Sequence, residues 1–325
     1  MSSRPIILLG STGHLGSKVH RMLKDKVSDA PILPPSDATT ASFLRQGAIV
    51  IDCSDSYLSD VPSLIRDCIS QGAVLVEALA GTETMKNSLS AEHILPAGSG
   101  SALLGIGIFP GLTNMMVREL ADNASPKEIT VGVRVAVLSG AGSSMRRLMV
   151  DLAYGGSPLE TPTNLVFPSG THKGVSVSLA DRFLIEAEYP GAKVSTLLGL
   201  KPEFVVGILQ LTSKLSTFQF LRWFIVPTVK VGLYLSRGLV LRSAPAAVEI
   251  SVCVDGRTLF AQTNDGIKTA AQVIVATAVI LAARDDLPAG LNFADEVVRL
   301  NEIRACAALL FGAEFDLVIS PKNDE

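Results

Sequence analysis

Three glycines close to the N-terminus have the spacing of a dinucleotide-binding turn. The segment GSTGHLG follows the short apolar run Pro5–Leu9 and leads into a helical pattern over His14–Lys24. In such a turn the first glycine allows a tight bend, the second lets the backbone approach a pyrophosphate, and the third lets helix and strand pack closely. The start of the helix adds unpaired N–H groups and a partial positive charge for the phosphates. The pattern predicts that NAD or NADP binds at Gly10, Ser11, Thr12, Gly13, His14, Leu15 and Gly16.

The choice between NAD and NADP depends on the residue that meets the adenosine ribose. Asp37 stands roughly 20 residues after the glycines, the distance at which an acidic residue holds the ribose 2′-OH of NAD. Asp37 is equally well placed to cap a helix over Thr39–Arg45. Arg45 or Lys24 would suit the 2′-phosphate of NADP, so the sequence leaves the choice open.

Further candidate contacts follow other predicted strands. The runs Ala48–Asp52 and Ala102–Ile108 are continuous and apolar, as buried parallel strands are. Ligands bind beyond the carboxyl ends of the strands in open α/β sheets. Glu77, near the end of a strand predicted over Ala73–Ala78, is either a structural carboxylate or a site residue. The residues expected to face the cofactor at these strand ends are Cys53, Ser54, Asp55, Phe109, Pro110 and Gly111.

A few polar side chains are candidates for chemistry beside a bound dinucleotide. The cofactor carries hydride transfer itself, but a proton donor helps. Tyr57 and His172, the latter in a predicted loop, are the candidate catalytic residues. Asn114, Arg146 and Arg147 are the candidate substrate ligands, with a salt bridge as the alternative role of the two arginines. The sequence has no G-x-S-x-G elbow and no H-E-x-x-H motif, and we predict no metal site.

Composition excludes several classes of protein. The 325 residues suffice for about two domains, and 48% of them are hydrophobic, which is enough for a sizeable core. The net charge of −3 argues against nucleic-acid binding, which needs a basic excess. The sequence lacks a signal-peptide pattern and any run of about 20 apolar residues. Four cysteines without C-x-x-C spacing favour a reducing, cytoplasmic location over a disulfide framework.

The order of the predicted elements indicates two domains. Alternating strands and helices over residues 1–125 predict a Rossmann-type, doubly wound parallel sheet. Residues 126–283 predict an α+β domain with a mixed or antiparallel sheet, and the last helix, within 284–320, is expected to pack back onto the first domain. Asp255-Gly256 between two apolar runs predicts a hairpin. The strands expected in this second domain are Lys127–Leu138, Val175–Leu179, Ala247–Val254 and Thr258–Gln262.

The segment 204–248 combines basic and apolar residues and has no acidic residue. One interpretation is a helical hairpin in the core or in a dimer interface. A second is a hydrophobic substrate pocket with a cationic mouth, and a third is docking on an anionic membrane surface. All three disfavour a small, highly charged substrate, because an apolar wall does not solvate charge. Its basic residues are Lys214, Arg222, Lys230, Arg237 and Arg242.

Several motifs resemble the saccharopine dehydrogenase-like oxidoreductases. The resemblance rests on GSTGHLG, on GIGIFPGLTNMMVRELA with its loop Gly107–Leu112, on the loop Ser139–Ser144, and on TNDGIKTAAQVIVATAVILAA followed by Gly290–Val297. The region between Gly16 and Asp52 is shorter than in that family. The segment AIVIDCSDSYLSDVPSLIRDCISQGAVLVEALAG is also similar to dihydrodipicolinate reductases, although their basic catalytic motif is not recognisable.

The resemblance implies an NAD(P)H-dependent oxidoreductase that forms a homodimer. Its expected reaction is reduction of a C=N or C=O group, or of an activated C=C bond, in a fairly hydrophobic small metabolite. Two rival hypotheses remain: a non-catalytic protein that senses dinucleotides, and a peripheral membrane reductase that modifies lipids through 204–248.

Overall fold

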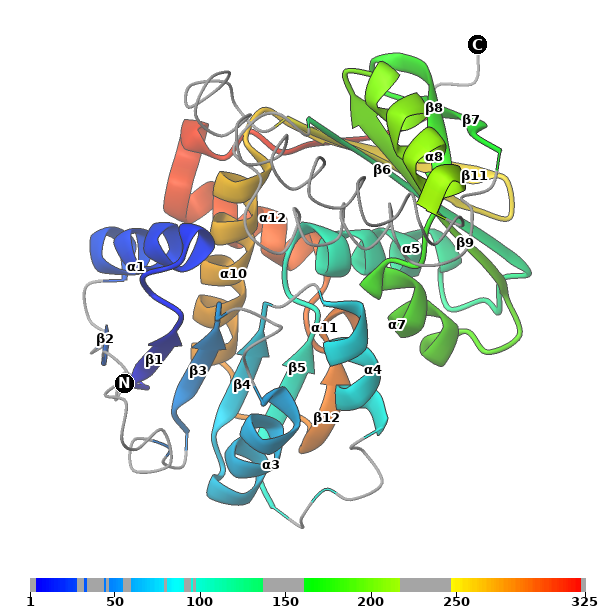
Figure 1. The fold of residues 1–325 in the computed structure, drawn as a ribbon. Coiled ribbons are helices and arrows are strands. Elements are labelled where there is room, and N and C mark those ends of the chain that lie inside the picture. Colours follow the sequence, from blue (N-terminus) through cyan, green and yellow to red (C-terminus); the bar gives the residue numbers. More distant parts are fainter. Residues whose placement is uncertain are drawn as a thin grey trace. The chain divides into compact units, whose positions relative to one another are not determined.

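Two compact units make up the chain, for which we have a computed structural model (Figure 1). The structure describes residues 4–27, 32–33, 44, 47–54, 60–78, 81–90, 95, 98–136, 161–216 and 247–322. The first unit comprises Met1–Glu119, Leu179–Glu188 and Ile267–Asp316, and the second comprises Leu120–Ser178, Tyr189–Gly266 and Leu317–Glu325.

This division differs from the predicted boundaries at 125 and 283. The chain returns twice to the first unit, once for the short stretch 179–188 and once for 267–316. The apolar segment from 267 onward therefore belongs with the first unit, although the prediction assigned it to the second domain up to residue 283. An apolar helix needs a large apolar surface to pack on, and its position in the sequence does not say which sheet supplies that surface.

The first unit contains a six-stranded sheet in which every pair of neighbours is parallel. The spatial order of its strands is β12-β5-β4-β3-β1-β2. This confirms the predicted doubly wound parallel sheet. The strands are β1 (Ile6–Leu9), β2 (Ile32–Leu33), β3 (Ile49–Asp52), β4 (Val74–Glu77), β5 (Ser101–Leu104) and β12 (Gly290–Phe293).

Both faces of this sheet are buried, which explains why its strands have continuous apolar sequences. Ile7 lies in one cluster with Ile65 of helix α3 (Val61–Gln71). Ile6 and Ile49 point to the opposite face and are equally buried, at 1% and 0% exposure. The other helices of the unit are α1 (His14–Lys26), α4 (Thr82–Ser90), α5 (Thr113–Ala121), α7 (Ala180–Glu188), α10 (Gly266–Ala282), α11 (Ala294–Val297) and α12 (Leu300–Phe311).

Helix α10 is a buried core helix. Seven of its apolar residues have no solvent exposure. A helix that is apolar on all sides is stable in water only when other elements surround it. No helix among the described residues is both long and apolar enough to cross a membrane. The seven residues are Ala271, Val273, Ile274, Val275, Ala276, Ala278 and Leu281.

The strand order places a topological switch point between β1 and β3. From β1 the chain first adds β2 on one side and then crosses to add β3, β4 and β5 on the other. Doubly wound sheets bind ligands in the crevice that this reversal opens beyond the carboxyl ends of the strands. In this unit the residues after Leu9 and after Asp52 stand at the switch point.

The second unit contains a seven-stranded mixed sheet in the order β13-β11-β10-β6-β9-β8-β7. Only β6 and β9 pair in parallel within it, and the other neighbours are antiparallel. This confirms the predicted mixed sheet. Its elements are β6 (Glu128–Ala136), β7 (Thr163–Phe167), β8 (Gly170–Ser176), β9 (Lys193–Lys201), helix α8 (Phe204–Ser216), β10 (Val248–Val254), β11 (Arg257–Thr263) and β13 (Val318–Pro321).

Two hairpins in this sheet can be compared with the hairpin predicted at Asp255-Gly256 and with the loop predicted at His172. The hairpin of β10 and β11 is confirmed, with Asp255 and Gly256 at φ angles of 47° and 85°, as a type I′ turn requires. The strand predicted over Val175–Leu179 is wrong at both ends, because β8 ends at Ser176. His172 consequently lies on a strand and not in a loop, since the turn to β7 occupies only the two residues before Gly170.

Candidate functional site

The glycine turn after β1 is packed against the backbone that follows β3. Gly10 has a φ of +72°, and a Cβ atom built on it would lie 2.5 Å from the carbonyl carbon of Cys53. A Cβ on Gly16 would lie 2.1 Å from the carbonyl oxygen of Gly10. Neither position has room for a side chain, because each meets backbone and not the movable end of a side chain. The first and third glycines therefore have the packing roles expected of them.

Gly13 has a different role from the other two glycines. It is the N-cap of α1, with φ −69° and ψ 169°, and a Cβ there would lie 3.2 Å from the Gly10 carbonyl oxygen. No side chain caps α1 and no acidic residue lies in its first turn. The first N–H groups of a helix have no acceptor inside the helix. Because Thr12, Gly13 and His14 are exposed, this helix start is open to an anion.

The end of β3 presents a buried carboxyl group beside the glycine turn. Asp52 is fully buried, and its Oδ1 accepts hydrogen bonds from the backbone N–H of Ser54 at 2.9 Å and from the Ser54 hydroxyl. Its Oδ2 has no hydrogen-bond partner among the described residues. Burial raises the pKa of Asp52, although the two Ser54 hydrogen bonds act in the opposite direction. The two hydrogen bonds between Ser54 and Asp52 fix the chain directly after β3.

Cys53 contributes backbone and not a reactive thiol. Its side chain is buried, and burial together with the nearby Asp52 and Glu77 raises the pKa of the thiol. A thiol with a raised pKa stays protonated at neutral pH and is a poor nucleophile. The predicted role of Cys53 as a cofactor contact is therefore available only through its main chain.

Glu77 ends β4 and lies opposite Asp52 in the register of β3 and β4. The side chain is 1% exposed, and its Oε2 accepts the backbone N–H of Gly105 at 2.9 Å. Of the two roles left open by the sequence, this hydrogen bond supports the structural carboxylate. Glu77 holds the start of the loop that follows β5.

The loop after β5 begins earlier than the sequence predicts. The strand ends at Leu104 and not at Ile108, because Gly105 takes a φ of +72° that breaks the ladder. Gly111 has a φ of +123°, and its N–H donates to Oδ1 of Asn114 at 3.3 Å. Pro110 is buried, whereas Phe109 is partly exposed. Of the predicted cofactor contacts in this loop, Phe109 is therefore the one with solvent access.

Asn114, predicted as a substrate ligand, is almost completely buried. It is 2% exposed, and its Oδ1 is used by Gly111, while its Nδ2 has no partner among the described residues. The neighbouring Thr113 donates to Asp181 of α7 through a short hydrogen bond. Asp181 is fully buried, and burial raises its pKa to about 7. Asn114 and Asp181 are therefore buried polar residues behind the loop, with almost no solvent exposure.

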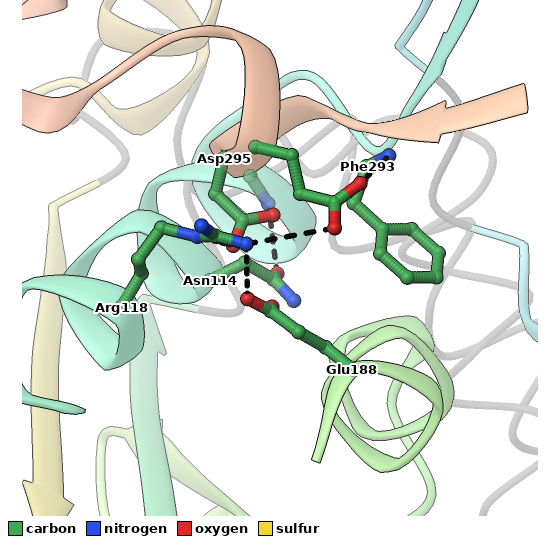
Figure 2. A network of polar contacts seen from close by, with 7 residues as sticks. Asn114, Arg118, Glu188, Phe293 and Asp295 are labelled. Atoms are coloured by element: carbon green, nitrogen blue, oxygen red, sulfur yellow. Dashed lines mark hydrogen bonds and ion pairs between the residues drawn. The ribbon is translucent and has the colours of Figure 1, made fainter. Parts of the chain in front are cut away.

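A second polar network joins α5, α7 and α11 in the first unit (Figure 2). Arg118 of α5 forms an ion pair with Glu188 and another with Asp295, the latter with 3.0 Å between Nε and Oδ2. Oε1 of Glu296 lies 3.6 Å from the same guanidinium. Asp295 is 2% exposed, so this ion pair is shielded from solvent on the carboxylate side. The network fixes the returning helix α7, and the sequence pattern gave no sign of it because its members lie far apart in the chain.

His172 belongs to a polar cluster on the sheet of the second unit. Its Nε2 lies 3.0 Å from Oγ of Ser169, and its Nδ1 lies 4.0 Å from a carboxylate oxygen of Glu203. The Ser169 hydroxyl also donates to Glu249 at 2.8 Å, and Glu249 accepts from Arg134 at 2.7 Å. The candidate proton donor is therefore tied into hydrogen bonds that stabilise a hairpin turn.

Several predicted site residues lie outside the described residues. They include a candidate ribose ligand, a candidate proton donor and both candidate arginines, so their roles stay predictions. Among the residues that the structure describes, no group of His, Cys, Asp and Glu side chains is arranged to hold a metal ion. The positions outside the description are Asp37, Asp55, Tyr57, the loop Ser139–Ser144, Arg146, Arg147 and residues 217–246.

Comparison with known proteins finds similarities at low identity and low TM-score. No family model matches the chain, and no curated protein matches it. An amine dehydrogenase from Mycobacterium smegmatis is 13% identical with a TM-score of 0.44, over 92% of this chain and 97% of that one. A dipicolinate-bound dihydrodipicolinate reductase from Paenisporosarcina sp. TG-14 is 12% identical with a TM-score of 0.38, over 92% and 100%. An aspartate dehydrogenase from Thermotoga maritima is 8% identical with a TM-score of 0.39, over 88% and 99%.

Identities and TM-scores this low do not establish an activity for this chain. The activity has to be argued from the residues of the chain itself. All three similar structures are dehydrogenases or reductases, and none of the three is a saccharopine dehydrogenase. The resemblance to the saccharopine dehydrogenase-like group therefore stays a prediction from the motifs.

Proposed function

We propose that the first unit binds NAD(H) or NADP(H) beyond the ends of β1 and β3, and that the protein is an NAD(P)-dependent oxidoreductase. The observation that carries this proposal is the glycine turn at the switch point of a parallel sheet, followed by a helix start without a side-chain cap. The motif resemblance described above agrees with this assignment.

The residues of the turn are suited to bind a dinucleotide. The N–H groups at the start of α1 and the helix dipole suit the pyrophosphate, and no acidic side chain in the first turn opposes it. The close packing of Gly10 on the Cys53 backbone holds the glycine turn against the chain that follows β3. The cofactor, when bound, supplies or accepts the hydride. The chain binds and orients it, and the partly exposed Phe109, in the loop after β5, offers an apolar surface.

The proposed reaction is the reduction of a C=N or C=O group, or of an activated C=C bond, in a fairly hydrophobic metabolite. Support for a hydrophobic substrate comes from the apolar sequence of 204–248, which has no acidic residue. Support for reduction comes from the motif resemblance alone. Tyr57 and His172 remain the proposed proton donors, and His172 would have to leave its hydrogen bond with Ser169 to act.

Cofactor binding is tested by fluorescence titration of the full chain with NADH and with NADPH. The matched variants are Gly13→Asp and Gly13→Asn, which have the same shape and differ in charge. Both side chains suit the φ and ψ of this N-cap, so both variants are expected to fold. The aspartate would occupy the free N–H groups and repel the phosphates. We expect it to weaken binding at least about tenfold more than the asparagine does.

Two results would contradict the assignment. One is a folded wild-type protein that binds neither NADH nor NADPH. The other is a folded Gly13→Asp variant whose affinity equals that of the wild type, because the helix start would then not meet the phosphates. Circular dichroism of each variant establishes that it is folded. The ratio of the NADH and NADPH affinities would in addition decide which dinucleotide is the cofactor.

A further inference from the structure

The loop after β5 is held at both of its ends by side chains of the first unit. At its start the backbone N–H of Gly105 donates to Glu77 at 2.9 Å. At its end the N–H of Gly111 donates to Oδ1 of Asn114 at 3.3 Å. Between these two points lies Phe109, which is partly exposed. The side chain of Asn114 therefore fixes the end of the loop that leads into α5.

Asn114 is connected to a buried carboxyl group through one hydroxyl. Oγ1 of Thr113 lies 3.4 Å from Oδ1 of Asn114 and is also hydrogen-bonded to Oδ1 of Asp181 on α7. All three side chains are almost fully buried. Helix α7 packs on the loop as well, since a Cβ atom on Gly105 would lie 2.7 Å from Cδ1 of Leu184. Asp181 is thus linked to the end of the loop by hydrogen bonds and to its start by packing.

The hydroxyl of Thr113 has two acceptor partners and only one hydrogen. It can donate to Asp181 or to Asn114, but not to both. When Asp181 is ionised, its carboxylate takes this hydrogen, and Asn114 keeps only the hydrogen bond from Gly111. When Asp181 is protonated, its own O–H can donate to Thr113, and the Thr113 hydrogen is then free for Asn114. The number of donors to the Asn114 oxygen therefore depends on the proton of Asp181.

The surroundings of Asp181 favour the protonated form below neutral pH. Burial raises its pKa to about 7, although hydrogen bonds act in the opposite direction. Oδ2 of Asp181 has no hydrogen-bond partner among the described residues, whereas Oδ1 faces the Thr113 hydroxyl. A buried O–H group without an acceptor is costly, so the proton is expected on Oδ1.

The charged side chains around α7 are engaged with one another. Within the described part of the chain, α7 packs on α4 and on the loop after β5, and it is hydrogen-bonded to α5. The shift in the pKa of Asp181 comes from burial and hydrogen bonds. The charged residues of these elements are Glu83 paired with Lys86, Arg118 paired with Glu188 and Asp295, Arg182 paired with Glu186, and the exposed Glu119.

We propose that Asp181 is a positioning residue: in its protonated form it holds the loop after β5, through Thr113 and Asn114, in the conformation that meets the cofactor. This inference rests on the proposed binding of NAD(P)H and on Phe109 as one of its contacts. Asp181 itself is fully buried and does not touch the cofactor. The affinity for NADH is expected to fall as pH rises through about 7, because ionised Asp181 withdraws the Thr113 hydrogen from Asn114.

The experiment is fluorescence titration of the full chain with NADH at about pH 6 and about pH 8, on either side of neutrality, and the measured quantity is the ratio of the two Kd values. We expect this ratio to be about fivefold larger in the wild type than in Asp181→Asn or Thr113→Val, which is the equivalent of one hydrogen bond. The asparagine does not titrate, and the valine has no hydroxyl to connect Asp181 with Asn114. Thr113→Ser keeps the hydroxyl and is expected to show the wild-type ratio.

Other groups that change charge in this range act equally in all of these variants. Histidine titrates between about pH 5 and 8, and His14 lies in the glycine turn. Its effect is common to the wild type and the variants, so it cancels when their ratios are compared. NADH is used because the 2′-phosphate of NADPH, a monoester, itself titrates near about pH 6.

The proposal is overturned if a folded Asp181→Asn variant keeps the wild-type ratio. It is also overturned if Thr113→Ser responds to pH as little as Thr113→Val does. Circular dichroism establishes that each variant is folded, and Asp181→Asn decides the question alone if the valine variant does not fold.

Hydrogen exchange of the loop separates this proposal from the proposed function. A wild type that binds no NADH contradicts the proposed function, but the loop can still be measured without cofactor. At about pH 6 we expect the N–H of Gly111 to exchange at least about threefold faster in Thr113→Val than in Thr113→Ser, because Asn114 then lacks its second donor. Equal exchange in the two variants would overturn the positioning role of Asp181.

Discussion

Two helices of equal length show how differently the two units present themselves to solvent. Helices α1 and α8 each have 13 residues, and each buries one apolar side against its own sheet. The outward side of α1 is polar and its N-terminal end is left without a cap, whereas α8 has an apolar outward side. The first helix is therefore suited to act at its end, through backbone N–H groups, and the second along its side, through side chains.

The same contrast holds for the polar groups of the two units. The first unit buries carboxyl groups with raised pKa values, at Asp52 beside the glycine turn and at Asp181 behind the loop after β5. The main polar cluster of the second unit is partly buried and pairs its charges directly, as Arg134 and Glu249 do at 2.7 Å. A buried carboxyl group with a raised pKa makes the free energy of unfolding depend on pH.

The largest expected effect concerns the backbone packing at the start of α1. Gly16→Ala places a Cβ atom 2.1 Å from the Gly10 carbonyl oxygen, which cannot move without moving the turn. We expect a loss of at least about 3 kcal/mol in the free energy of unfolding, although alanine is the better helix former. Urea unfolding followed by circular dichroism measures this loss.

The matched control is Gly191→Ala in the second unit. A Cβ atom on Gly191 would meet no heavy atom within 4 Å, so its free energy of unfolding should stay within about 0.5 kcal/mol of the wild type. Equal stability of the two variants would mean that α1 does not begin against the glycine turn. The proposed phosphate site would then lose its geometric basis.

Much of this first unit could be predicted from the sequence, because its signals are local. Continuous apolar runs predict β1, β3 and β4 to within a residue or two, and the glycine spacing predicts the turn before α1. The hairpin at Asp255-Gly256 is also local, since those residue types tolerate the positive φ angles of the turn. In each case a few neighbouring residues determine the structure.

Other features depend on partners that are distant in the chain. Arg118 finds Asp295 across 177 positions, and Thr113 finds Asp181 across 68, distances at which one sequence carries no pairing signal. Strand β7 was not predicted, because its side chains are largely exposed and lack an apolar pattern. For the same reason the sequence did not predict that His172 lies on strand β8. Of the candidate site, the glycine turn was predictable, and the buried polar interior behind the loop after β5 was not.

A second effect on stability concerns the buried and the exposed side of helix α8. Leu209→Ala and Leu211→Ala remove the same atoms two residues apart, from a side chain 6% exposed and from one 58% exposed. We expect Leu209→Ala to cost about 2–5 kcal/mol of stability and Leu211→Ala to change it by less than about 0.5 kcal/mol. Urea unfolding of both variants measures the difference. Equal losses would show that Leu211 is covered in solution, and the contrast between the two sides of α8 would not hold.

The last effect is a change in how stability depends on pH. Asp181 has a pKa raised to about 7 by burial, against a value near 3.8 when it is exposed in the unfolded chain. Between these two values the folded state holds a proton that the unfolded state has lost. The contribution of Asp181 to stability is therefore fully present below the unfolded pKa and is lost as pH rises toward 7. The slope of that loss is at most about 1.4 kcal/mol per pH unit.

Asp181→Asn isolates this contribution, because the amide keeps an oxygen for the Thr113 hydroxyl and does not titrate. The difference in unfolding free energy between wild type and variant should fall as pH rises from about 4 to 7 and stay level above that. Urea unfolding at a series of pH values measures it. A difference that is constant over this range would mean that Asp181 is ionised in the folded state. The first unit would then have a partner for that charge, and the contrast between the polar groups of the two units would rest on Asp52 alone.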